Sequence, residues 1–148
     1  MNPELAQALE DSQVIIDKGN QFIDEMNESY RAVYEKLMML PLKLDSFVNY
    51  YERYHPEDPT EMWGGKRLAF MVDTSSQKDN NWTILFSVFN IKCSGSDDSE
   101  GGMLFEDDTV QEWPWTVAPL KERLEAYPHL LTLFQQVMQQ YEYAIQQE

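Results

Sequence analysis

The chain has 148 residues, which is about one domain and enough to bury a hydrophobic core. Its hydrophobic fraction of 43% and aromatic fraction of 13% exclude a disordered chain, even though the net charge is −15. That charge disfavours direct binding to nucleic acid or to an anionic membrane. It favours a basic partner or serves solubility alone.

Cys93 is the single cysteine, so an internal disulfide is excluded and a reducing compartment is favoured. We recognise no signal peptide at the N-terminus and no apolar run of about 18 residues that would span a membrane. We therefore expect a cytoplasmic protein that does not bind membranes.

The first forty residues predict one long helix. Asn2 suits the helix cap, Pro3 suits the first turn, and Pro41 cannot continue a helix. At 1.5 Å per residue, the helix would be roughly 57 Å long. Its weak point is Gly19, which marks a kink or break or else lets another backbone approach closely.

Along this segment one position recurs at alternating steps of four and three, which is the heptad rhythm of coiled coils. We call this set the N-terminal stripe. It consists of Leu5, Leu9, Ser12, Ile16, Gly19, Ile23, Met26, Tyr30, Val33, Leu37 and Leu40.

The middle of the chain first predicts a helix and then a sheet. Residues 42–54 place Leu44, Phe47, Val48 and Tyr51 on one helical face, and residues 61–65 read as a loop. Residues 67–72 and 82–93 are apolar runs that predict an antiparallel hairpin, with the second run covered on both sides. A third strand is expected at 102–105 or 110–113, because an isolated hairpin is unstable.

The last segment repeats the rhythm of the first from Leu120 to Ile145, but its apolar face is broad enough for a globular core. Pro128 predicts a kink in this helix or a break into two helices.

We therefore predict one α+β domain over residues 1–148. Long N- and C-terminal helices pack side by side and with a small antiparallel β-sheet, formed by the hairpin 67–93 and a short third strand. Two roles stay open for the N-terminal stripe. It is either intramolecular core or the contact of a homodimer formed through the N-terminal helix.

The chemistry of the chain does not indicate an enzyme. His55 and His129 are the only histidines, and neither forms a catalytic signature with Cys93 or has metal-ligand spacing. The acidic residues near position 100 lack the spacing of a calcium loop. We expect no catalytic residue, no cofactor and no metal.

The most unusual segment lies between residues 97 and 115. It holds seven acidic residues and no basic one, followed by two tryptophans. The set comprises Asp97, Asp98, Glu100, Glu106, Asp107, Asp108, Glu112, Trp113 and Trp115. Negative charge that steers an encounter, combined with aromatic anchors, suits the capture of a basic protein. The alternative is a solvated loop followed by ordinary core aromatics.

Two functions follow from these patterns. The first is a non-enzymatic acidic binding protein that recognises a basic protein, such as a nucleic-acid-binding protein or a toxin. By the logic of immunity proteins and DNA mimics, it would also inhibit that partner. The second is a helix-mediated homodimeric scaffold or chaperone-like adaptor, in which the charge serves solubility.

Overall fold

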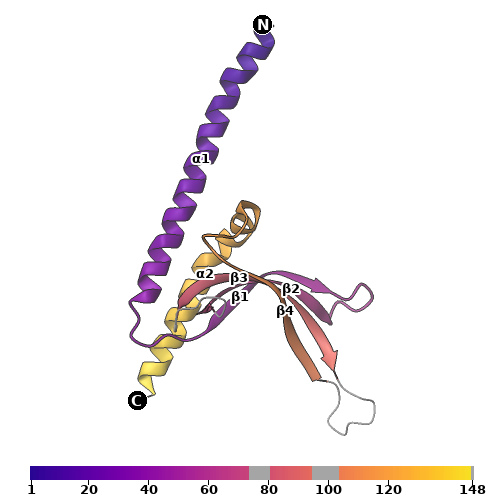
Figure 1. Cartoon of the computed structure of the whole chain (residues 1–148), viewed down its shortest axis with the longest axis vertical. Helices are drawn as coiled ribbons and strands as arrows, with labels where there is room; N and C mark the ends of the chain where they lie inside the picture. The colour runs from indigo at the N-terminus through magenta and orange to yellow at the C-terminus, as the bar shows by residue number, and fades with distance from the viewer. Residues whose placement is uncertain (74–80, 95–103, 148) are drawn as a thin grey trace. The chain divides into compact units, whose positions relative to one another are not determined.

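The computed structural model of the protein describes residues 1–73, 81–94 and 104–147. It has a long helix at each end and a four-stranded antiparallel sheet between them, so the α+β prediction is confirmed (Figure 1). The elements are α1 (Pro3–Met38), β1 (Ser46–Tyr54), β2 (Met62–Val72), β3 (Trp82–Ser94), β4 (Leu104–Pro114) and α2 (Leu120–Gln146).

The chain divides into two compact units, Met1–Lys36 and Leu37–Glu148, and each is described by itself. The first unit consists almost entirely of α1, and the second holds the sheet and α2. The packing of the two terminal helices against each other stays a prediction.

The helix α1 is one uninterrupted helix of 36 residues, about 54 Å long. Asn2 caps it as predicted, because its Oδ1 accepts a hydrogen bond from the backbone N–H of Glu4 at 2.7 Å. Glutamine–carboxylate pairs four residues apart support the exposed surface, as in Gln13–Asp17 at 2.9 Å. Gly19 does not break the helix.

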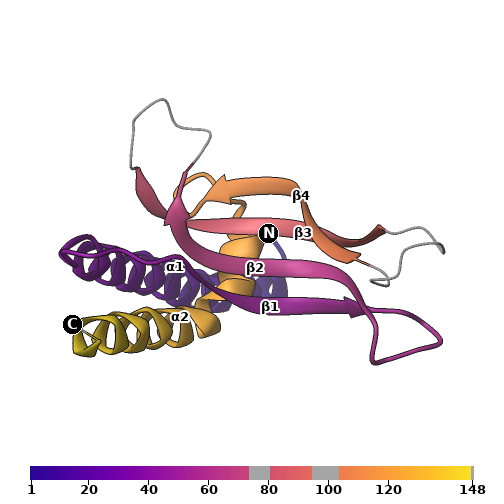
Figure 2. The ribbon, with the colours of Figure 1, turned by 90° about the horizontal axis from the view of Figure 1, so that it is seen from below.

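The four strands follow one another in the sheet in the order β1-β2-β3-β4 (Figure 2). Strand β3 pairs with both β2 and β4, and its centre from Thr83 to Ser87 is buried. The predicted antiparallel hairpin, covered on both sides at its second strand, is therefore confirmed.

One face of the sheet packs against α2, which lies over β1 and β2. Tyr50 marks this face, because its ring contacts both Phe86 of β3 and His129 of α2. Leu68 and Phe86 are paired on the same face and are fully buried. The buried residues of α2 are Ala126, Leu130, Leu133 and Val137.

The prediction of a helix over residues 42–54 is wrong, because Ser46–Tyr54 is strand β1. The register of β1 against β2 shifts between Asn49 and Tyr51, and this bulge interrupts the two-residue alternation of a strand. The interrupted pattern imitated helical spacing. The aromatic and β-branched residues of the segment were the better guide.

The prediction of a loop over residues 61–65 is also wrong, because β2 begins at Met62. Gly64 and Gly65 lie inside the strand for a steric reason. A Cβ at Gly64 would collide with the carbonyl oxygen of Phe89, and one at Gly65 with that of Tyr51. These glycines allow close approach of the neighbouring strands rather than a turn.

Two further elements are longer than predicted. The third predicted strand is β4, a strand of 11 residues that includes residues 110–113 and the second half of 102–105. Residues 102 and 103 lie outside the described residues. The C-terminal helix is not divided, because Pro128 lies inside α2. Ala126 and Leu130 are both buried, so the apolar face continues past the proline. We attribute the continuity to this burial, which outweighs one lost backbone hydrogen bond.

Candidate functional site

The structure places part of the predicted acidic surface on β4, which is an edge strand of the sheet. In the register with β3, Glu106, Asp107 and Asp108 pair with residues 92, 91 and 90, and Glu112 pairs with Ser87. Asp97, Asp98 and Glu100 lie outside the described residues.

Glu112 is the acidic residue whose environment is the most distinctive. It is half-buried, and burial together with the neighbouring carboxylate of Asp73 raises its pKa above the usual value. A hydrogen bond from Ser87 partly offsets this increase. Asp73 is itself buried. The charge of Asp73 therefore acts on a carboxylate of β4.

The two tryptophans have different roles. Trp113 is half-buried on β4. Trp115 is 1% exposed, and its ring packs on Phe86 with centroids 5.2 Å apart. Trp115 is therefore a core residue and does not belong to a contact surface. This is the alternative that the sequence left open for it.

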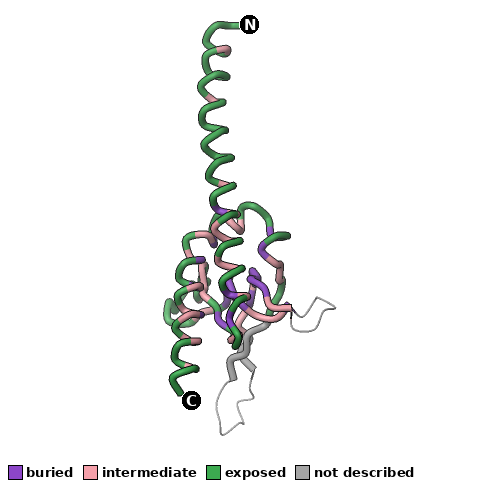
Figure 3. Tube along the Cα trace, turned by 90° about the vertical axis from the view of Figure 1, so that its left-hand side faces the viewer, coloured by how far each residue is buried: buried purple, intermediate pink, exposed green. Residues whose placement is uncertain are grey.

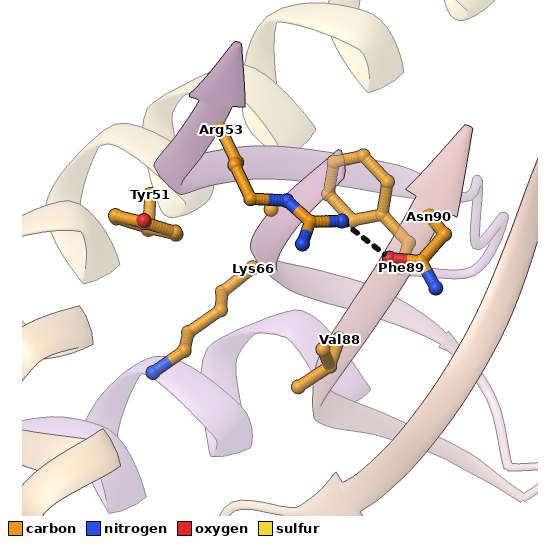
Figure 4. A pocket seen from close by; sticks show the side chains of 7 residues that line it. Tyr51, Arg53, Lys66, Val88, Phe89 and Asn90 are labelled. Atoms are coloured by element: carbon orange, nitrogen blue, oxygen red, sulfur yellow. Dashed lines mark hydrogen bonds between the residues drawn. The ribbon is translucent and has the colours of Figure 1, made fainter. Parts of the chain in front are cut away.

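A shallow hollow of about 260 Å³ lies on the sheet, and sequence reasoning missed it because its residues come from three strands. Figure 4 shows the Arg53 side chain reaching across to Asn90, whose Oδ1 accepts a hydrogen bond from Nη2 at 2.8 Å. The lining residues are Tyr51, Arg53, Gly65, Lys66, Val88, Phe89 and Asn90.

The ammonium group of Lys66 is occupied by carboxylates from α2. Its Nζ lies 2.8 Å from Oε1 of Glu122 and 3.7 Å from Oε2 of Glu125. Tyr50 donates a hydrogen bond to the other oxygen of Glu122 at 2.9 Å. This cluster fixes the start of α2 on the sheet, and it leaves little positive charge for an anionic ligand.

The pKa values in this cluster agree with that role. Burial alone would raise the pKa of Glu122, but the hydrogen bonds from Lys66 and Tyr50 outweigh it and hold this pKa below the usual value. The hydrogen bond with Glu122 raises the pKa of Lys66. The charged pair is therefore stabilised by the fold.

Most of α1 is exposed (Figure 3), and several of its large apolar side chains are among the exposed ones. Leu5 and Leu9 are each 52% exposed, Ile16 is 51% exposed and Phe22 is 47% exposed. We call this surface the docking face. It consists of Leu5, Ala8, Leu9, Ser12, Ile15, Ile16, Gly19 and Phe22.

Charge is kept away from the docking face. If Leu9 and Ile16 occupy heptad position a, the docking face uses positions a, d and g, and every acidic residue of α1 falls at b, c or f. These residues are Glu4, Glu10, Asp11, Asp17, Asp24, Glu25, Glu28 and Glu35. The heptad spacing was visible in the sequence, but the exposure of the face was not.

The described residues contain no group of three or more His, Cys, Asp or Glu side chains placed to hold a metal ion. No helix among them is long and apolar enough to cross a membrane. Compared with known protein families, curated proteins and solved structures, the chain shows no significant match.

Proposed function

We propose that this chain is a non-enzymatic, helix-mediated scaffold or adaptor that docks another amphipathic helix on α1. The observation that supports it is the docking face, where large apolar side chains remain about half exposed and which contains none of the acidic residues of α1. Contiguous exposed apolar surface on a soluble protein marks an interaction site. A regular heptad rhythm selects a helix as the partner.

The proposal is tested with two matched variants of α1. Ile16→Lys puts a charge in the centre of the docking face, whereas Val14→Lys changes an equally apolar residue, 56% exposed, on the opposite side of the helix. Both variants should keep the helical circular dichroism of the native chain. We expect Ile16→Lys to abolish association and Val14→Lys to preserve it.

Association is measured in two ways. Light scattering gives the mass of the purified chain, and retention from a lysate of the native host, with mass spectrometry, gives heterologous partners. The proposal is wrong if neither the mass nor the set of retained proteins changes between Ile16→Lys and Val14→Lys.

A second candidate function is the capture of a basic protein on the side of the sheet formed by β4. The observation that favours it is the pair of carboxylates at Glu112 and Asp73, since burial and like charge give Glu112 a raised pKa. Perturbed carboxylates of this kind are enriched at functional sites. A cationic side chain from a partner would relieve the repulsion. Such a partner would also be inhibited if it uses the same surface to bind nucleic acid.

This second candidate is tested by salt and by one neutralising change. A basic protein retained at low salt should be lost at high salt, because screening weakens steered capture. Glu112→Gln should reduce its retention, whereas Glu57→Gln, an exposed acid in the β1–β2 turn, should not. Retention that is unaffected by salt and by Glu112→Gln would contradict this candidate.

A further inference from the structure

We propose that the partner of the docking face is a second copy of this chain, bound so that the two α1 helices run antiparallel. The inference rests on the proposed function and names its partner. It comes from the order of large and small residues along the N-terminal stripe. From Leu9 onward the order is large, small, large, small, through Leu9, Ser12, Ile16 and Gly19.

An antiparallel pair centred between Ser12 and Ile16 matches each large residue with a small one. Ile16 lies opposite Ser12 of the second copy, and Leu9 lies opposite its Gly19. Twofold symmetry repeats both contacts, so four consecutive layers each combine one large and one small side chain. Such layers interdigitate at the density of a protein interior.

A parallel pair in register does not give this complementarity. Each residue would meet its own copy, so Ser12 would face Ser12 and Gly19 would face Gly19. These layers would leave voids between the helices, while Leu9 and Ile16 would hold them apart. Voids in an apolar contact are costly, because the lining atoms lose their packing partners.

The flanking residues support the same orientation. Ile15 is 71% exposed and lies near the twofold axis of the antiparallel pair, where it meets Ile15 of the second copy. Phe22 comes near Ala8 of the second copy, so a large residue again meets a small one. The contact then has an apolar border on the side of Ala8, Ile15 and Phe22, as well as an apolar centre.

The polar groups of the docking face tolerate burial. The Ser12 hydroxyl donates a hydrogen bond to the carbonyl oxygen of Leu9 at 2.7 Å, so burying it leaves no unmatched donor. Space beside Gly19 is open, with no atom within 4 Å of an added Cβ. The carboxylates of α1 all lie at outer helix positions. Two copies therefore approach without like charges in direct opposition, although each chain is strongly acidic.

The orientation is tested by cysteine crosslinking of the full chain. Cys93 is first replaced by serine, and two single-cysteine chains are made, Leu9→Cys and Gly19→Cys. These positions are ten residues apart, or about 15 Å along the helix. A disulfide needs its Cα atoms within about 7 Å. In an antiparallel pair, a disulfide forms only between a Leu9→Cys chain and a Gly19→Cys chain. In a parallel pair, it forms only between two identical chains.

We expect the mixture of the two chains to give a disulfide-linked dimer under mild oxidation and each chain alone to give almost none. Dimers from each chain alone would overturn the antiparallel arrangement and leave the scaffold proposal standing. A native chain that is monomeric at all concentrations, yet retains another protein through Ile16, would overturn the second copy as partner. A monomer that retains nothing would overturn both proposals.

A second variant gives a reading that does not depend on oxidation. Gly19→Leu improves helix propensity, and the space at its Cβ is open within the chain. In the antiparallel pair it collides with Leu9 of the second copy and should raise the dimer dissociation constant by about tenfold or more. In a parallel pair it would fill the gap at Gly19 and tighten the dimer, which would contradict the inference. Adding Leu9→Ala to Gly19→Leu should restore much of the affinity.

Discussion

The two long helices carry the same apolar rhythm but have different surroundings. One side of α2 is buried, with Leu133 and Val137 almost inaccessible, and α2 packs on β1 and β2. The residues on its heptad rhythm lie beside that buried side, and Leu120 and Leu131 are 39% and 62% exposed. The docking face of α1 remains about half exposed at Leu9 and Ile16. A heptad rhythm therefore identifies an apolar face without identifying what covers it.

Side-chain hydrogen bonds to other elements also distinguish α2 from the first half of α1. The side-chain amide of Gln136 in α2 donates to Ser46 Oγ at 2.7 Å and to the carbonyl oxygen of Phe47 at 2.8 Å. Glu122 adds its bonds to Lys66 and Tyr50. The glutamines of the first half of α1, such as Gln13, bond within their own helix. Fixed anchors of this kind suit a core helix.

The largest expected difference between the two helices is the cost of removing a leucine side chain. Leu133→Ala should lower the free energy of unfolding by about 2–5 kcal/mol, because it leaves a cavity in a fully buried site. Leu9→Ala should change it by less than about 0.5 kcal/mol in dilute solution, where α1 has no second copy. Urea denaturation at low protein concentration measures both. Equal effects would show that α1 is part of the same core.

The glycines provide the next comparison. Gly65→Ala should destabilise the fold by about 1–3 kcal/mol, because the added Cβ collides with a backbone oxygen of β1. Gly19→Ala should instead stabilise α1 by about 0.5–1 kcal/mol, because alanine is the better helix former and nothing lies near its Cβ. Thermal unfolding followed by circular dichroism gives both signs. A stable Gly65→Ala variant would mean that the strands separate more easily than their register implies.

The anchor of α2 should be sensitive to acid. Glu122→Gln should cost about 1.5–3 kcal/mol at pH 7, since it weakens hydrogen bonds to a charged group. The pKa of Glu122 is lowered in the folded chain, so its contribution is present above 4.5 and is lost as pH falls through the folded pKa. The difference between native and variant stability should therefore shrink below pH 4.5. If the difference in stability between the native chain and the variant stays constant with pH, the charge of Glu122 does not cause it.

Glu112→Gln should change the free energy of unfolding in the opposite direction to Glu122→Gln, and by the smallest amount. The pKa of Glu112 is raised in the folded chain, so its charged form opposes folding. Glu112→Gln should stabilise the fold by up to about 1 kcal/mol at pH 7, and this gain should disappear as pH falls through the raised pKa. Urea denaturation at several pH values measures it. A destabilised variant at pH 7 would mean that Ser87 and other contacts outweigh the repulsion.

Much of the fold was predictable because local signals agreed with the final structure. Asn2 caps α1, and the apolar centre of β3 is covered on both sides. The predictions were wrong where tertiary packing overrode the local sequence pattern. A bulge at Tyr50 concealed the alternation of β1, and Gly64 and Gly65 imitated a turn inside β2.

The candidate sites were predictable only in part. The charge of the acidic segment was evident from the sequence, but the burial of Trp115 under the sheet was not. The hollow beside Arg53 depends on three strands and has no continuous motif.

By itself, the sequence determined the two amphipathic helices, the antiparallel hairpin between them and the separation of charge from the docking face. These properties depend on residue spacing, which is set by the repeat of a helix or a strand. Only the tertiary structure decided that β1 is a strand, that Trp115 is core and that Leu133 and Val137 of α2 are buried while the docking face of α1 is exposed. Those outcomes depend on which surfaces meet, because burial is a property of neighbours that are distant in the chain.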